Sequence, residues 1–126
     1  MRQRMRRGEP APDDAIVIVR ANRLDPELLT TDAQKNFEIY GFFGISVFAE
    51  LGDQTWMLIA RDKFAEAPWI VLFEAGALVD AGLDLWDTGR APHYDIVHGD
   101  LGELIRRILA TPHRVYAIPY HPRSER

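Results

Sequence analysis

The sequence predicts a single domain of the α/β class, or of the related α+β class, with a mixed sheet of five to six strands and flanking helices. Short runs rich in β-branched residues alternate along the chain with segments of helical period, a pattern typical of sheets covered by helices. Two alternating segments near residue 90 predict one antiparallel hairpin. A length of 126 residues and a hydrophobic content of 47% fit one folded domain.

Charge divides the chain into three parts. Residues 1–12 form a basic leader, which we expect to be disordered; residues 13–120 form the globular domain, and residues 121–126 a short tail. Between residues 11 and 120 there are 17 acidic and 9 basic side chains, a net charge of −8. Such a domain is a poor match for nucleic acid, because affinity for phosphates requires positive charge.

Composition also bears on location. No apolar run approaches the roughly 20 residues that a bilayer span requires, so we expect no membrane contact. The chain has no cysteine, which excludes disulfides and thiolate ligands and fits a reducing cytoplasm. We therefore expect a cytoplasmic protein.

The first elements are a strand and a helix. Ala15–Val19 is a continuous run of mostly β-branched residues, which predicts a strand covered on both faces. Asp25 is the expected N-cap of a helix that begins at Pro26 and ends at Gly41, with a second capping box over Thr31–Gln34 where the helix could restart. The apolar face of this helix is expected to consist of four residues: Leu29, Ala33, Phe37 and Tyr40.

Three further elements follow in the middle of the chain. Gly44–Ala49 predicts a second strand. A helix capped by Asp53 and running to about Phe64 is predicted next, although Trp56–Ala60 also fits a strand. Trp69–Phe73, which follows a proline, predicts a third buried strand, and the short helix after it covers residues 75–81.

The last third contains the hairpin, a helix and a strand. Leu83–Asp87 and His93–His98 alternate in polarity and are predicted to pair through the intervening turn. Asp100 caps the most strongly periodic helix, which Pro112 ends, and Glu103 reads as its capping partner rather than as a catalytic acid. A final short strand is expected over residues 114–118.

The second strand of the hairpin holds the highest density of groups able to transfer protons. In a regular strand His93 and Asp95 point to one face, and Tyr94 and His98 point to the other. A His–Asp pair on an exposed strand face suits a general base, because the carboxylate orients the imidazole and raises its basicity. A polar surface without catalytic function explains the same pattern, so both interpretations stay open.

The sequence also bears on two other classes of chemistry, metal binding and NAD-dependent transfer. The sequence has no metal-binding histidine motif and no glycine-rich phosphate loop, so we predict no metal site. ADP-ribosyltransferases place an arginine on a first strand, a serine on a later strand and a glutamate further on, around bound NAD. Arg20 and Ser46 fit the first two positions, and Glu50, Glu74 or Glu103 could fill the third.

Four segments together resemble a family of small actinobacterial proteins, over residues 15 to about 100. These segments are Ile18–Arg20, Tyr40–Val47, Leu78–Gly82 and Thr88–Asp95. The resemblance implies a small cytoplasmic protein that forms one half of a bacterial two-gene module of the toxin–antitoxin type, with a small co-encoded protein as its partner. It implies no particular reaction and no catalytic residues.

Three functions stay open, and we rank a toxin-like effector first. Its default chemistry is a metal-independent ribonuclease without a cofactor, in which His93 is the base or acid, Arg20 stabilises phosphate charge, and Tyr94 or Asp95 orients His93. The alternatives are an NAD-dependent transferase that uses Arg20 and Ser46, and a non-catalytic module that binds a partner protein through aromatic residues. RNA binding and self-association are compatible with these three functions.

Overall fold

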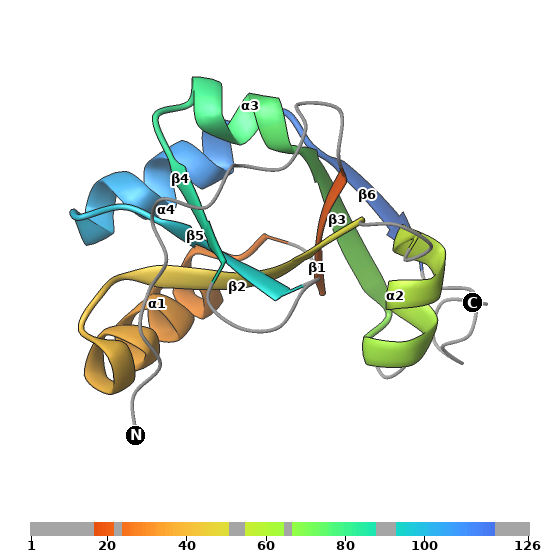
Figure 1. The fold of residues 1–126 in the computed structure, drawn as a ribbon, viewed down its shortest axis with the longest axis horizontal. Helices are drawn as coiled ribbons and strands as arrows, with labels where there is room; N and C mark the ends of the chain where they lie inside the picture. The colour runs from red at the N-terminus through yellow and green to blue at the C-terminus, as the bar shows by residue number, and fades with distance from the viewer. Residues whose placement is uncertain (1–16, 22–23, 51–54, 65–66, 88–92, 118–126) are drawn as a thin grey trace.

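The computed structural model describes residues 17–21, 24–50, 55–64, 67–87 and 93–117. Within them, six strands form one sheet that four helices flank (Figure 1). The strands are β1 (Val17–Ala21), β2 (Gly44–Ala49), β3 (Trp69–Glu74), β4 (Asp84–Asp87), β5 (His93–Val97) and β6 (Arg114–Ala117). The helices are α1 (Pro26–Tyr40), α2 (Trp56–Lys63), α3 (Ala75–Asp80) and α4 (Leu101–Ala110). The predicted leader and tail lie outside the described residues.

The strand order is β4-β5-β2-β1-β3-β6. The predicted single domain, with its hairpin of β4 and β5, is confirmed. We expected a mixed sheet, but all five pairings of the described strands are antiparallel, which agrees with the α+β alternative. Even β1 and β2, which α1 connects, run antiparallel. A strand–helix–strand pattern is typical of parallel neighbours, so the pattern alone did not predict this direction.

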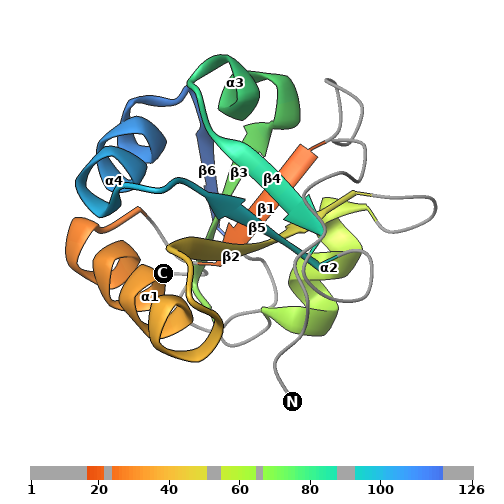
Figure 2. The same ribbon diagram turned by 60° about the vertical axis from the view of Figure 1, so that its left-hand side comes forward.

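The helices divide between the two faces of the sheet. Residues of α1, α3 and α4 form the larger core with one face, and α1 and α4 lie side by side there (Figure 2). Residues of α2 pack on the opposite face, against β1 and β3. Ile18 and Val19 point to different faces and are both fully buried, as predicted for a strand covered on both sides.

Helix α1 keeps its predicted ends, whereas the predicted start of α2 needs correction. Asp25 accepts hydrogen bonds from the backbone N–H groups of Glu27 and Leu28, as expected of an N-cap, but α1 then continues without a restart. The helical alternative for the segment after β2 is confirmed, although its N-cap is Thr55, which accepts from the N–H of Leu58. Asp53, the predicted cap, lies outside the described residues.

The buried face of α1 also differs from the prediction. Leu29 and Ala33 are buried as expected, but the third buried residue is Asn36, whereas Phe37 is 48% exposed. The amide of Asn36 donates a 2.6 Å hydrogen bond to the carbonyl of Gly44, which makes its burial tolerable. The polar residue therefore ties α1 to the start of β2, and the aromatic residue remains at the surface.

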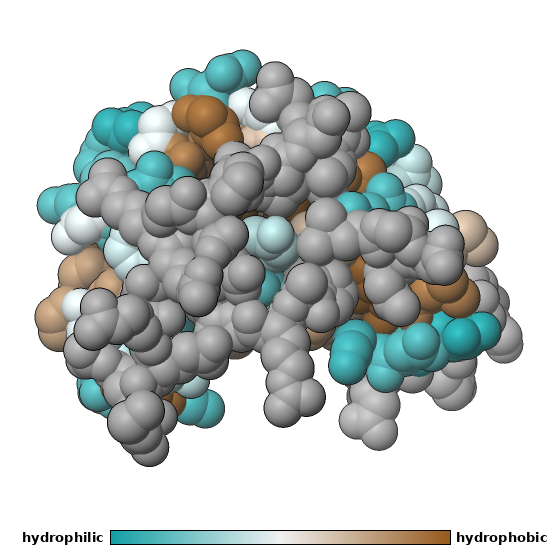
Figure 3. All heavy atoms as spheres, viewed as in Figure 1, coloured by the Kyte–Doolittle hydropathy of each residue, from teal (hydrophilic) through white to brown (hydrophobic). Residues whose placement is uncertain are grey.

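Helix α2 is amphipathic and short. It buries Ile59 and Ala60 and exposes Met57 together with the charged Arg61 and Lys63. In the space-filling view, hydrophobic and hydrophilic areas lie next to each other over this helix (Figure 3). No helix of the described part of the chain is long and apolar enough to cross a membrane.

Candidate functional site

The predicted hairpin site lies where β5 pairs with β2. Asp95 stands opposite Ser46 and His93 opposite Phe48, so these four side chains share one face of the sheet. The His–Asp pair was expected on an exposed face, but this is wrong, since Asp95 is only 3% exposed. The ring of His93 is half-buried and meets the ring of Phe48 edge to face, with 5.4 Å between centroids.

The side chains around this pair have structural contacts. The hydroxyl of Ser46 donates to Oδ1 of Asp95 over 3.2 Å, which links neighbouring strands. Tyr94 belongs to the larger core, on the face of the sheet opposite to His93. Its phenol therefore cannot orient His93 in this arrangement, although the sequence placed the two side by side.

His98 lies beyond the end of β5 and shapes the start of α4. Its ring nitrogen Nδ1 accepts a 2.9 Å hydrogen bond from the N–H of Asp100. Oδ1 of Asp100 in turn accepts from the N–H of Glu103 over 2.8 Å. This confirms that Asp100 is a helix cap, with His98 in the reciprocal role that we expected of Glu103.

Glu103 instead forms an ion-pair network on the surface of α4. Its carboxylate accepts two hydrogen bonds of 2.7 Å from Arg106 and one of 3.2 Å from Arg107. These bonds, that of Arg106 most strongly, lower the pKa of Glu103 from 4.5 to about 2. Arg107 also donates to the carbonyl of Ala81, which joins α4 to the end of α3.

Arg20 closes a gap in the sheet. β1 and β2 form two residue pairs, Ile18 with Ala49 and Val19 with Phe48. If that register continued, Ala21 would pair with Ser46, but the described strands do not pair there. Instead, the Arg20 guanidinium donates to the carbonyl of Ser46 over 2.9 Å.

The second partner in this gap comes from α1. The carboxylate of Asp32 accepts a longer bond of 3.4 Å from the N–H of Ser46 and pairs with Arg20 at 3.0 Å. Two side chains thus satisfy the backbone groups that a missing ladder would leave unpaired. We call Arg20, Asp32 and Ser46 the Arg20 junction.

The junction bears on both predicted enzymes. Arg20 and Ser46 do meet, as the transferase hypothesis requires, but through the serine carbonyl, while the hydroxyl turns to Asp95. Within the described residues, the hydrogen bonds of the Arg20 side chain run to Asp32 and Ser46 and not to His93. The contacts of Arg20 are those of a residue that holds the sheet together.

A different site forms at the corner between α1 and β2. Gly41 ends the helix with a φ of 83°, which glycine adopts without strain. The ring of Phe43 stacks on that of Phe37 at a centroid distance of 4.5 Å. The ring of Phe42 folds over Gly44, where any Cβ would collide with it, and lies 5.5 Å from the ring of Trp86.

These rings border a cavity of about 310 Å³, which we call the aromatic pocket. Its lining consists of Phe37, Gly41, Phe42, Phe43, Asp84, Trp86, Val97, His98 and Gly99. Within the described residues, Nε1 of Trp86 is buried and has no hydrogen-bond partner. An unsatisfied buried donor costs about 1–3 kcal/mol, so this wall of the pocket is not optimised for stability.

Sequence reasoning did not identify this pocket as a site. One local signal was present, namely a single glycine on each side of two aromatic residues in Gly41–Gly44. Trp86 comes from the hairpin, more than 40 positions later in the chain, so the pocket depends on the pairing of β4, β5 and β2. Its walls follow from strand order rather than from any local motif.

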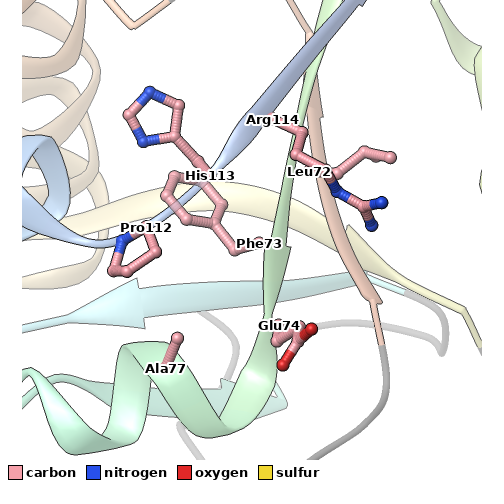
Figure 4. A pocket seen from close by; sticks show the side chains of 7 residues that line it. All are labelled: Leu72, Phe73, Glu74, Ala77, Pro112, His113 and Arg114. Atoms are coloured by element: carbon pink, nitrogen blue, oxygen red, sulfur yellow. The ribbon is translucent and has the colours of Figure 1, made fainter.

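A second cavity, of about 360 Å³, lies where β3 meets α3 and the start of β6. Its ionisable residues are Glu74, His113 and Arg114. Figure 4 shows His113 and Arg114 on opposite sides of β3, with Glu74 at the end of that strand. The His113 ring contacts Phe73, and the Arg114 guanidinium lies over the ring of Tyr116, so the three groups do not converge.

The described residues contain no group of three histidine, aspartate or glutamate side chains that could hold a metal ion. Comparison of the chain with models of known families, with characterised proteins and with solved structures found no match.

Proposed function

We propose that this chain is a protein-binding module and that it binds its partner through the aromatic pocket. The observation that carries the proposal is the pocket itself, with four aromatic side chains around a cavity of about 310 Å³. Aromatic residues are enriched where proteins bind one another, because their large rings bury much area and lose little conformational freedom. Phe37, at one edge of the pocket, is already half exposed.

The contacts of the predicted catalytic residues support binding over catalysis. Arg20 bonds to Asp32 and to the Ser46 carbonyl, and the Ser46 hydroxyl bonds to Asp95. Tyr94 lies in the core on the other face. A ribonuclease or transferase needs such groups to act on a substrate, whereas here they stabilise the sheet.

The partner is proposed to be a small protein encoded beside this chain, as in a two-gene module of the toxin–antitoxin type. Its apolar or aromatic side chains would bury Phe37 and enter the pocket beside Phe42 and Trp86. Loss of water from these rings supplies the main favourable free energy of such an interface. The chain needs no cofactor for this function.

Calorimetry with the purified product of the neighbouring gene tests the proposal. Phe37→Ser is expected to weaken binding about tenfold or more, since a central aromatic contact is lost. Val79→Ser is the matched control, because Val79 is equally exposed but lies on α3, outside the pocket lining. Unchanged affinity in Phe37→Ser, or no binding by the wild-type chain, overturns the proposal.

The ribonuclease and the NAD-dependent transferase stay predictions with tests of their own. Expression of the isolated chain should arrest bacterial growth if it is a toxin-like effector, and His93→Ala should relieve the arrest without lowering the melting temperature. Ser46→Ala should abolish transfer from NAD if the transferase prediction holds. Growth arrest that needs His93 would also contradict the binding module.

A further inference from the structure

Strand β6 is one of the two outermost described strands of the sheet, and it is the less covered of the two (Figure 1). Within the described residues it pairs with β3 alone. All four of its residues, Arg114–Ala117, are exposed, with Val115 at 40% and Tyr116 at 39%. On β4, the other outermost strand, Leu85 is buried and Trp86 is half-buried. The described structure therefore leaves β6 with little cover on either face.

The open edge of β6 fits an extended segment of chain. In an antiparallel ladder, alternate residues direct their N–H and C=O groups away from the neighbouring strand, so part of the backbone of β6 points to the open edge. Val115 pairs with Val71 and Tyr116 with Ile70, and these partners belong to cores on opposite faces of the sheet. A strand added at the edge would cover part of both exposed side chains, whereas a helix could cover only one face.

The symmetry of a pair of identical strands limits how two copies of β6 can meet. When two copies pair antiparallel about a twofold axis, opposite residues share a face, so one residue must lie at the axis and face its own copy. Pro112 and Pro119 flank the strand in the sequence, and proline cannot donate to a strand ladder. The axis is therefore confined to the few residues between them.

Val115 is the residue that fits the axis best. An axis at Arg114 would oppose two positive charges, which destabilises a strand pair. An axis at Val115 places two apolar side chains together and brings each Arg114 beside Tyr116 of the other copy, so a cation meets an aromatic ring twice. An axis at Tyr116 would lose both of these contacts. The ring of Trp56 stacks on that of Tyr116 at a centroid distance of 5.3 Å, which holds the tyrosine in place.

We propose that two copies of this chain form a dimer by antiparallel pairing of their β6 strands, with Val115 at the twofold axis. A second copy is favoured over a segment of another protein because the side chains of β6 complement themselves in this register. The only charge on β6 is the positive Arg114, so the acidic residues behind the net charge of −4 lie elsewhere. The dimer goes beyond the proposed function, since it uses the edge of the sheet opposite to β4.

Sedimentation velocity of the full chain over a series of concentrations tests the dimer. We expect a reversible dimer with a Kd on the order of 10–100 µM, because one strand pair buries less than the about 1,600 Å² of a standard interface. Val115→Lys should weaken it at least about tenfold, since two ammonium groups would face each other at the axis. Val79→Lys is the matched control, because Val79 is 45% exposed but lies on α3. A monomeric wild-type chain, or unchanged dimerisation of Val115→Lys, overturns the inference.

A mixture of two variants tests the register. Val115→Glu should also be monomeric by itself, since two carboxylates would meet at the axis. An equimolar mixture of Val115→Glu and Val115→Lys should dimerise, because position 115 of one copy faces position 115 of the other. A mixture of the two folded variants that stays monomeric overturns the inference, and circular dichroism shows that both variants are folded.

Amide hydrogen exchange of the wild-type chain tests the same edge without any substitution. The amides of β6 should exchange more slowly as the protein concentration rises, while those of β4 should not change. Protection of β6 that is independent of concentration would show that another segment of the same chain covers the edge, and would overturn the inference. Protection that appears only with the product of the neighbouring gene would assign the edge to that protein and overturn it as well.

Discussion

Two parts of β2 use side chains in opposite ways. At the Arg20 junction, in the middle of the strand, polar side chains replace missing backbone hydrogen bonds, so that both the N–H and the carbonyl of Ser46 are satisfied. At the aromatic pocket, where β2 begins, large apolar side chains surround a cavity and leave the indole N–H of Trp86 without an acceptor in the described part of the chain.

The difference shows which residues are available for function. A charged residue on a strand attracts attention in a sequence, yet Arg20 is committed to the sheet. Phe42 and Phe43 carry no ionisable group, yet they enclose space next to an unsatisfied donor. The unsatisfied donor and the aromatic lining of the pocket are features from which binding of a partner would gain free energy.

The largest effect is expected from Arg20→Ala. The variant leaves the Ser46 carbonyl unpaired and removes the ion-pair partner of Asp32, so the free energy of unfolding should fall by about 2–3 kcal/mol. Urea unfolding measures it, with Lys35→Ala on the exposed side of α1 as the control. A stable Arg20→Ala variant that no longer binds the partner protein or no longer arrests growth would contradict this comparison and make Arg20 a functional residue.

Asn36→Ala tests the boundary between the two regions. Its amide is the donor to the buried Gly44 carbonyl, at the point where the pocket meets β2. Removal should cost about 1–2 kcal/mol because the carbonyl is left without that donor. Chemical denaturation gives the value; a loss below about 0.3 kcal/mol would mean that the carbonyl finds another partner.

Trp86→Phe should have a smaller effect on stability than Arg20→Ala or Asn36→Ala. The substitution removes ring area, which destabilises, and removes a buried donor without an acceptor, which stabilises. We expect a net change of less than about 1 kcal/mol in the free energy of unfolding, with binding of the partner protein weakened. A loss above about 3 kcal/mol would show that the indole is structurally required, as Arg20 is, and would remove the contrast.

The exposed Glu103 network is expected to give the smallest effect on the free energy of unfolding. Because folding lowers the pKa of Glu103 from 4.5 to about 2, its contribution is complete above pH 4.5 and is lost as the pH falls toward 2. Glu103→Gln should therefore flatten the decline of stability in this pH window; its small destabilising effect should be present at neutral pH and disappear as the pH falls toward 2. Urea unfolding over a pH series checks this; parallel curves for both proteins would contradict it.

Local patterns in the sequence determined the elements and their ends. Asp25 and Asp100 cap helices through neighbours two or three positions away, and Gly41 ends α1 within the same turn. The pairing of the two hairpin strands likewise follows from alternation over a few residues. Such features depend on short-range hydrogen bonds and on backbone preference, so they can be predicted before the fold is known.

Only the tertiary structure decided strand direction, the role of Arg20 and the position of the pocket. Arg20 meets the Ser46 carbonyl across 26 positions, and Ser46 meets Asp95 across 49. Whether a charged residue bonds to the backbone or faces a substrate depends on which strands become neighbours, and that choice minimises the free energy of the whole core. A residue type therefore predicts what chemistry is possible, and its neighbours in the fold determine whether that chemistry is free to act.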